Sequence, residues 1–265
     1  MTWIKAKKAL GQNFLVDKNI AAKIVKSLEI EKNDLVVEIG PGTGLLTEHI
    51  FQYSENMSLI ELDQRAIEVL QGKFMINYPN ISIVHQDFRK INLQEIFINN
   101  NNSKILVIGN IPYYITGDIF FKLFENSTFI KRAIITVQKE VAQRIIAKTS
   151  TKDYGILTIA AAYCCESSLL FDIPAECFVP KPNVTSSVVL LNFKENFNFK
   201  EFKKLLGVVK QAFNQRRKML SNTLKGQISE KYDEEWKDYK SLRPENLLID
   251  DFMKLLKLIE NSKNE

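Results

Sequence analysis

Short runs of apolar, β-branched residues alternate with segments of helical spacing from about residue 20 to residue 165. This alternation is typical of βαβ units around a parallel sheet. The pattern predicts strands at residues 35–40, 57–62, 81–86, 104–109 and 133–138. Helical spacing between them predicts helices such as Thr43–Gln52 and Gln64–Phe74.

Two more apolar runs, residues 164–173 and 186–193, follow without a long helix between them, so we expect an antiparallel pair that closes the sheet. After Phe193 the chain becomes rich in Lys and Glu with a helical period and no strand pattern. The sequence therefore predicts an α/β catalytic domain with a Rossmann-like, mostly parallel seven-stranded sheet over residues 1–194. A small all-helical domain follows over residues 195–265.

The composition is that of a folded globular protein, with 45% hydrophobic and 25% charged residues. Global disorder is excluded. No apolar run approaches the roughly 18 residues that span a bilayer, and the N-terminus lacks the apolar core of a signal peptide. We therefore expect a cytoplasmic protein.

The net charge of +5 is unevenly distributed. Residues 200–225 carry eight Lys or Arg and one acid, residues 1–26 carry six Lys and one Asp, and residues 226–265 have a net charge of −3. Basic patches of this kind suit a polyphosphate partner such as a nucleic acid. On charge alone, solvated helix faces are an equal alternative.

The three cysteines, Cys164, Cys165 and Cys177, show no CxxC spacing and are odd in number, which favours reduced, packed thiols. The two histidines, His49 and His85, have no metal-like neighbourhood. We predict no metal site.

The first strong motif is a glycine-rich turn, Gly40–Gly44, between a predicted strand and a helix. Glycines allow a tight turn and close approach of the main chain to a ligand. The spacing differs from the dinucleotide GxGxxG motif, and no GK[ST] ending of a phosphate-binding loop is present. A glycine-rich turn without a ligand remains the alternative.

Two acidic positions follow at the ends of the next two strands. Glu61 lies about 20 residues after the first glycine, where a carboxylate can accept hydrogen bonds from ribose hydroxyls, and Asp63 is its rival. Asp87 ends the third strand, where it can accept from an adenine amino group or serve as an ordinary N-cap. Because open α/β sheets bind ligands at the carboxyl ends of their strands, the set predicts an adenosine-containing cofactor.

The segment Asn110-Ile111-Pro112-Tyr113, at the end of the fourth strand, predicts the reaction. An adenine amino nitrogen is a poor nucleophile because its lone pair is delocalised into the ring. The Asn110 side-chain oxygen and the Ile111 carbonyl can accept its two hydrogens, and Pro112 stiffens the turn that holds them. Tyr113 can stack on the base, which orients the nitrogen for in-line attack on a sulfonium methyl group.

Motifs along nearly the whole chain resemble the KsgA family of rRNA adenine dimethyltransferases, which are class I S-adenosylmethionine-dependent methyltransferases. The matching segments are GQNFL (11–15), EIGPGTGLLT (38–47), IELD (60–63), QDF (86–88), GNIPYYIT (109–116), QKEVAQRI (138–145), DYGILT (153–158), CFVPKPNV (177–184) and AFNQRRKML (212–220). The last of these resembles KsgA and not the related Erm enzymes.

The resemblance implies S-adenosylmethionine as cofactor, bound by Asn13, Leu15, Gly40, Glu61, Asp87 and Asn110, with Asn13 and Leu15 on an N-terminal segment that folds over it. It implies that Phe178 sandwiches the target base opposite Tyr113; the residue type alone would suggest a core position. Tyr114, Asn183 and Thr185 depart from the Asn, Lys and Asp that are usual in the family, which puts the shape and charge of the target-base entrance in doubt.

The implied substrate is a pair of adjacent adenines in the 3′-terminal hairpin of 16S rRNA within the immature small ribosomal subunit. The helix with Arg216, Arg217 and Lys218 is expected to contact RNA phosphates, and we expect a monomer. The alternatives are an Erm-like enzyme acting on 23S rRNA and a nucleic-acid-binding relative without catalysis. Glu61, Asp87 and the Asn110–Tyr113 motif disfavour the second of these.

Overall fold

The chain, described by a computed structural model over residues 4–79, 81–101 and 103–263, divides into two compact units. The first comprises Met1–Ala142 and Glu166–Glu195, and the second comprises Gln143–Cys165 and Asn196–Glu265.

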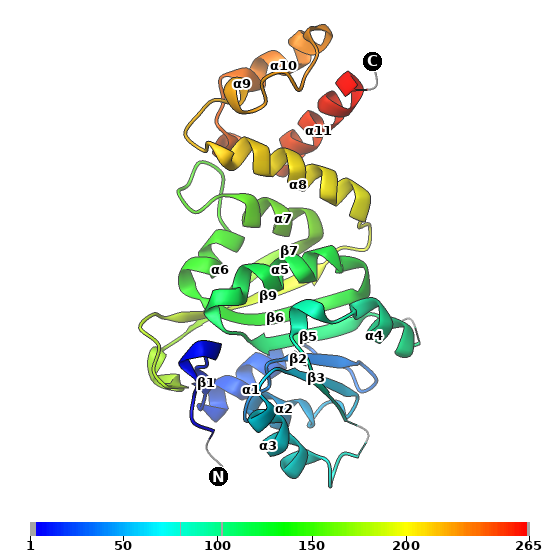
Figure 1. The fold of residues 1–265 in the computed structure, drawn as a ribbon, viewed down its shortest axis with the longest axis vertical. Coiled ribbons are helices and arrows are strands. Elements are labelled where there is room, and N and C mark those ends of the chain that lie inside the picture. The colour runs from blue at the N-terminus through cyan, green and yellow to red at the C-terminus, as the bar shows by residue number, and fades with distance from the viewer. Residues whose placement is uncertain (1–3, 80, 102, 264–265) are drawn as a thin grey trace. The chain divides into compact units, whose positions relative to one another are not determined.

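The first unit contains a seven-stranded sheet in the order β4-β3-β2-β5-β6-β9-β7 (Figure 1). Its strands are β2 (Val36–Ile39), β3 (Met57–Glu61), β4 (Ser82–His85), β5 (Ile105–Asn110), β6 (Ile130–Gln138), β7 (Cys165–Ile173) and β9 (Ser186–Phe193). The strands β4, β3, β2, β5 and β6 pair in parallel, and β9 pairs antiparallel to β6. The predicted mostly parallel, seven-stranded α/β fold is therefore confirmed.

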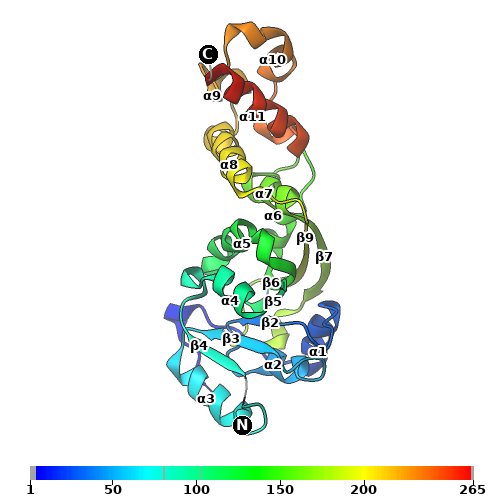
Figure 2. The ribbon, with the colours of Figure 1, turned by 90° about the vertical axis from the view of Figure 1, so that its right-hand side faces the viewer.

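Helices cover both faces of this sheet. They are α1 (Lys18–Ser27), α2 (Leu45–Ile50), α3 (Gln64–Phe74), α4 (Leu93–Asn99) and α5 (Thr116–Glu125), with α6 (Lys139–Ile145) crossing the division between the units. From β2 the chain passes through α2 to β3 and through α3 to β4 at one edge of the sheet. It then returns through α4 to β5, on the other side of β2, and continues through α5 to β6. Right-handed crossovers therefore place the two pairs on opposite faces, as Figure 2 shows for α2 against α4 and α5.

The core follows from the sequence of the central strands. Every residue of β2 and β3 is buried, as expected for parallel strands that are covered on both faces. Side chains such as Val36, Leu59 and Leu106 belong to one cluster with Ile24 of α1 and Ile50 of α2. Glu38 is the one charged residue of β2, and its carboxyl group is buried in a strand that is otherwise apolar.

A second, two-stranded sheet joins the N-terminal segment to the main body. Its strands β1 (Phe14–Leu15) and β8 (Phe178–Val179) pair antiparallel, with Leu15 opposite Phe178. The main-chain N–H of Val16 also donates to the carbonyl of Cys177 (2.8 Å). These bonds fix the position of the residues that precede β1.

The second unit is all-helical. Its helices are α7 (Ile156–Cys164), α8 (Phe199–Asn214), α9 (Leu220–Thr223), α10 (Asp233–Lys240) and α11 (Ile249–Lys263). Their core contains Ile159 of α7, Leu205 of α8 and Phe252 of α11. The sequence places α7 in the catalytic domain, whereas its contacts group it with the helical unit. The apolar residues of α7 predict that the helix is buried, but they do not indicate which helices it packs against. The division into a catalytic domain and an RNA-binding domain at residues 194/195 stays a prediction.

Cys164 and Cys165 are buried free thiols and Cys177 is partly buried. In the described part of the chain, no helix combines the length and apolar character needed to cross a membrane.

Candidate functional site

A cavity of about 1050 Å³, part of it open to solvent, lies at the carboxyl ends of β2, β3 and β5 in the first unit. Its lining includes every residue that the sequence assigns to the cofactor, together with the predicted base-binding motif: Asn13, Leu15, Gly40, Glu61, Asp87, Asn110, Ile111, Pro112 and Tyr113. The cavity thus brings together residues from five separate segments of the chain.

The glycine-rich turn shapes one wall of this cavity. Gly40 and Gly42 have φ angles of +63° and +56°, in the left-handed region that favours glycine. A Cβ atom at Gly42 would come within 2.9 Å of the Phe14 ring, so glycine here also lets the N-terminal segment approach. A Cβ atom at Gly40 would meet no other atom within 4 Å, which leaves the main chain open toward a ligand.

The structure distinguishes Glu61 from its rival Asp63. Glu61 ends β3 and lines the cavity, and its carboxylate accepts hydrogen bonds from the main-chain N–H groups of Gly42 (3.0 Å), Leu62 and Asp63 (both 2.8 Å). Asp63 does not line the cavity and is the N-cap of α3. The orientation of Glu61 is therefore fixed by the glycine turn, and Glu61 is the better candidate for ribose recognition.

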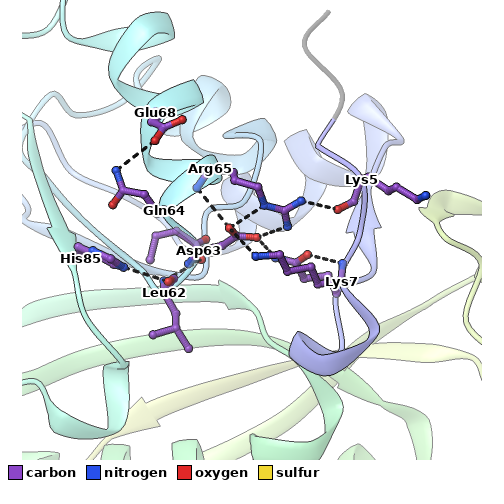
Figure 3. Close-up of polar contacts among 10 residues, drawn as sticks. Lys5, Lys7, Leu62, Asp63, Gln64, Arg65, Glu68 and His85 are labelled. Atoms are coloured by element: carbon purple, nitrogen blue, oxygen red, sulfur yellow. Dashed lines mark hydrogen bonds and ion pairs between the residues drawn. The ribbon is translucent and has the colours of Figure 1, made fainter.

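Asp63 instead holds the N-terminal segment (Figure 3). Its carboxylate forms a 2.5 Å ion pair with Arg65, lies 3.9 Å from the Lys7 ammonium group and accepts a hydrogen bond from Gln12 (3.0 Å). Arg65 in turn donates to the main-chain carbonyl of Lys5 (3.0 Å). Hydrogen bonding by Arg65 holds the pKa of Asp63 far below its usual range, so this cluster keeps its charge. The sequence motifs do not reveal this role.

Asp87 follows β4 and caps a short helical turn by accepting from the N–H of Arg89 (3.0 Å). The Arg89 guanidinium bonds both Asp87 oxygens and also reaches Asp118 (3.1 Å). The hydrogen bonds from Arg89 lower the pKa of Asp87 and keep it a charged acceptor at the cavity wall. Asp87 is therefore an N-cap that also lines the cavity, and its hydrogen bond with an adenine amino group stays a prediction.

Asn110 lies at the end of β5 with its side-chain amide held by the N-terminal segment. The amide nitrogen donates to the main-chain carbonyl of Asn13 (3.0 Å). The same amide therefore presents its oxygen as the remaining polar atom. An oxygen held in this way can accept a hydrogen from an exocyclic amino group.

Tyr113 is held by a residue of β9. Its hydroxyl shares a 2.7 Å hydrogen bond with the fully buried Ser186 of β9, and burial raises the pKa of Tyr113. Ile111, at 2% exposure, and Pro112 complete this wall. The Tyr113 ring thus lines the cavity in a fixed position.

Glu38 is a further cavity residue to which the sequence assigns no role. Its side chain is 1% exposed, accepts a 2.6 Å hydrogen bond from Thr47 and lies near Glu61. Burial raises the pKa of Glu38 to about 8, so the group is largely neutral at pH 7. The signal in the sequence is the single charged residue within the apolar run LVVEIG.

Phe178 does not line the cavity. Its side chain is 2% exposed and packs in the core with Leu15 and Ile173. The ring therefore lies in the core and not at the cavity wall, and the stacking opposite Tyr113 that the resemblance implies stays a prediction. The β1–β8 pairing draws Phe178 inward, which favours the core position that the residue type alone suggests.

The basic motif lies in the second unit, beyond the end of α8 and not on a helix as the sequence suggests. Arg216 donates to the main-chain carbonyls of Lys152 (2.6 Å) and Thr151 (2.8 Å) and lies 3.8 Å from the Glu245 carboxylate. Arg217 and Lys218 are exposed. The motif therefore combines one arginine bound within the unit with two exposed cations.

The positions that depart from the family pattern differ in their surroundings. Tyr114 lines the cavity, whereas Asn183 and Thr185 are exposed and do not line it. No group of three or more His, Cys, Asp or Glu that could hold a metal ion occurs among the residues that the structure describes.

Comparisons with known proteins show the family of the chain. The model of a family described as "Ribosomal RNA adenine dimethylase" matches residues 4–261. Two relatives named "Ribosomal RNA small subunit methyltransferase A" are each 42% identical. The one from Mycoplasma mobile aligns over 83% of both chains, and the one from Francisella tularensis over 95% of this chain and 96% of its own. The crystal structure of a dimethyladenosine transferase from Plasmodium falciparum superposes with a TM-score of 0.79 at 26% identity, covering 94% of this chain and 98% of its own.

Proposed function

We infer that this chain, which belongs to the ribosomal RNA adenine dimethylase family, transfers methyl groups to N6 of two adjacent adenosines in the 3′-terminal hairpin of 16S rRNA. The product is N6,N6-dimethyladenosine. The observation that carries the adenine target is the Asn110 amide, which lines the cavity together with Tyr113 and whose nitrogen is bonded to the Asn13 carbonyl, so that its oxygen remains as the acceptor.

The cofactor is S-adenosylmethionine, which supplies an electrophilic methyl group on sulfur. The cavity residues fit such a ligand by their chemistry. Glu61 offers a carboxylate for ribose hydroxyls, Asp87 offers a charged acceptor for the adenine amino group, and Gly40 leaves the main chain accessible. Asn13 and Leu15 would cover it from the N-terminal side.

We propose that the residues at the end of β5 bind and orient the target adenine. The Asn110 side-chain oxygen and the Ile111 carbonyl oxygen accept hydrogen bonds from the two N–H groups of the adenine amino group, which raises the electron density on its nitrogen. The Tyr113 ring stacks on the base and aligns the nitrogen for in-line attack on the methyl carbon. No side chain has to form a covalent bond with substrate.

The substrate form and the assembly state are also proposals. Immature small subunits are the proposed substrate. The proposed target bases lie in an rRNA hairpin loop, where bases are already partly unstacked and cost less to extrude than paired bases. A monomer, as expected at the outset, is the proposed assembly state. The cytoplasmic location expected from the sequence rests on this substrate.

The alternatives are not favoured. Both relatives at 42% identity are named for the small subunit. The alignment with the Francisella tularensis relative covers 95% of this chain. A binding factor without catalysis would not need the Asn110, Glu61 and Asp87 arrangement that the cavity retains.

The test supplies labelled S-adenosylmethionine with unmethylated small subunits and, separately, with 23S rRNA. We expect dimethyladenosine at the two adjacent positions of 16S rRNA. Product formed only in 23S rRNA would support the Erm-like alternative, and no transfer to either RNA would support the binding factor.

A further inference from the structure

Tyr114 is an aromatic residue at the mouth of the cavity with no role in the site described above. It lies in the short helical turn Tyr113–Ile115 and lines the same cavity as Tyr113. Its side chain is 61% exposed, against 41% for the exposed aromatic residues Tyr53 and Phe199. Single exposed aromatic residues are common on protein surfaces, so the position of Tyr114, and not its exposure alone, requires explanation.

The ring of Tyr114 rests against the main chain of the N-terminal segment. A Cβ atom at Gly11 would come within 2.9 Å of Cδ1 and 3.1 Å of Cε1 of Tyr114, and within 3.4 Å of Pro112. Gly11 also has a φ angle of +57°, which disfavours a larger residue. One side of the ring therefore packs against the protein, and the remainder is open to solvent.

Tyr113 and Tyr114 are consecutive, but their side chains have different surroundings. Tyr113 is half-buried and its hydroxyl is held by Ser186, so its ring serves the cavity wall. We propose that Tyr114 is a stacking platform for the nucleotide next to the adenine in the cavity, and hence an RNA-binding residue. This proposal rests on the proposed function.

The chemistry follows from the extrusion of one of two adjacent bases. When one adenine enters the cavity, its neighbour loses a stacking partner and presents a free π face. A tyrosine ring supplies a replacement at low entropic cost, because only two side-chain torsions have to be fixed.

The surroundings of Gly11 continue this surface. A second hollow on the N-terminal segment is lined by residues including Lys5, Val179 and Pro180, and it shares Gly11, Gln12, Asn13 and Phe14 with the cavity. Lys5 is exposed there and offers a positive charge for a phosphate. The neighbouring nucleotide can therefore remain on the protein surface while the target base occupies the cavity.

The test compares Tyr114→Ala, Tyr114→Asn and Tyr114→Phe on unmethylated small subunits at saturating S-adenosylmethionine. The Asn variant carries a residue that many family members have at this position, and so guards against misfolding. Tyr53→Ala is the matched control, because Tyr53 is an exposed tyrosine in a separate surface hollow. The measurements are kcat, KM for subunits, and the Kd for S-adenosylmethionine.

We expect Tyr114→Ala and Tyr114→Asn to raise KM for subunits by roughly tenfold to a hundredfold, the equivalent of one lost base–aromatic stack. The Kd for S-adenosylmethionine should not change, and Tyr114→Phe and Tyr53→Ala should resemble the wild type. The proposal is overturned if the Ala and Asn variants keep the wild-type KM, if cofactor affinity alone falls, or if Tyr114→Phe is as impaired as Tyr114→Ala. Failure of the wild-type chain to methylate small subunits would instead refute the proposed function and, with it, this inference.

Discussion

The side-chain amide nitrogen of Asn110 donates a 3.0 Å hydrogen bond to the main-chain carbonyl of Asn13, 97 residues earlier in the chain. This bond couples the N-terminal segment to the end of β5. It occupies the amide nitrogen and leaves the oxygen as the acceptor, so the N-terminal segment, which is proposed to cover the cofactor, also orients the proposed base acceptor.

The first prediction concerns Asp63, which holds that segment through Arg65, Lys7 and Gln12. Asp63→Asn keeps an N-cap for α3 but removes the charge that these groups share. We expect about tenfold weaker binding of S-adenosylmethionine, measured by titration calorimetry, because the loss of one charged hydrogen bond has this size.

Glu68→Gln is the matched control for this experiment, since Glu68 lies on the same helix and accepts a hydrogen bond from Gln64 (3.4 Å, Figure 3), away from the N-terminal segment. Unchanged cofactor affinity in Asp63→Asn would show that the segment is held without this cluster.

Glu38 predicts a pH dependence of stability. Its folded pKa of about 8 lies above the ordinary value of 4.5, so the folded chain binds more protons than the unfolded chain between these values. The contribution of Glu38 to stability is therefore present below about pH 4.5 and is lost as pH rises through 8.

Glu38→Gln removes this titration and retains an acceptor for Thr47. We expect the Tm of the cofactor-free variant to fall less than that of the wild type between about pH 5 and pH 9. The check is a melting series over that range. Parallel curves for the two proteins would mean that Glu38 is ionised in the folded chain.

Arg216 is expected to affect stability, whereas Arg217 and Lys218 are expected to affect RNA binding. Arg216→Ala should lower Tm, because the side chain bonds two main-chain carbonyls within its own unit. Arg217→Ala and Lys218→Ala should leave Tm unchanged, weaken binding to small subunits, and reduce the salt slope by about 1 each. Binding measured across several salt concentrations checks this. A wild-type slope in both exposed variants would remove them from the RNA interface.

Two roles for Phe178 can be distinguished by mutation: packing in the core, and stacking on the target base. If the ring only fills the core, Phe178→Leu should keep kcat/KM while Phe178→Ala should cost about 3–5 kcal/mol of stability. Kinetics and melting of both variants decide the matter. A large loss of kcat/KM in Phe178→Leu with little change in Tm would support the stacking role instead.

The centre of the sheet could be predicted because strands such as β2 and β3 are buried along their whole length and consist mostly of apolar residues. The end of β3 shows where such prediction stops. Glu61 and Asp63 point the same way along an extended chain, and only the structure shows that the strand ends at Glu61 and that Asp63 caps α3.

Features built from distant segments carried no local signal. The strands β1 and β8 have two residues each, too few for a periodic pattern, yet their pairing decides that Phe178 is buried. In the same way, the carbonyls that Arg216 bonds lie more than sixty positions earlier in the chain. Such contacts depend on tertiary packing.

The most direct test of the proposed chemistry is Asn110→Ala, assayed for methyl transfer to unmethylated small subunits and for binding of S-adenosylmethionine. We predict that transfer falls by about a hundredfold or more while the Kd for S-adenosylmethionine stays near the wild-type value, because the amide oxygen acts on the adenine. If cofactor binding were lost and transfer were normal at saturating cofactor, Asn110 would bind only the cofactor, and the proposed activation of the adenine amino group would be wrong.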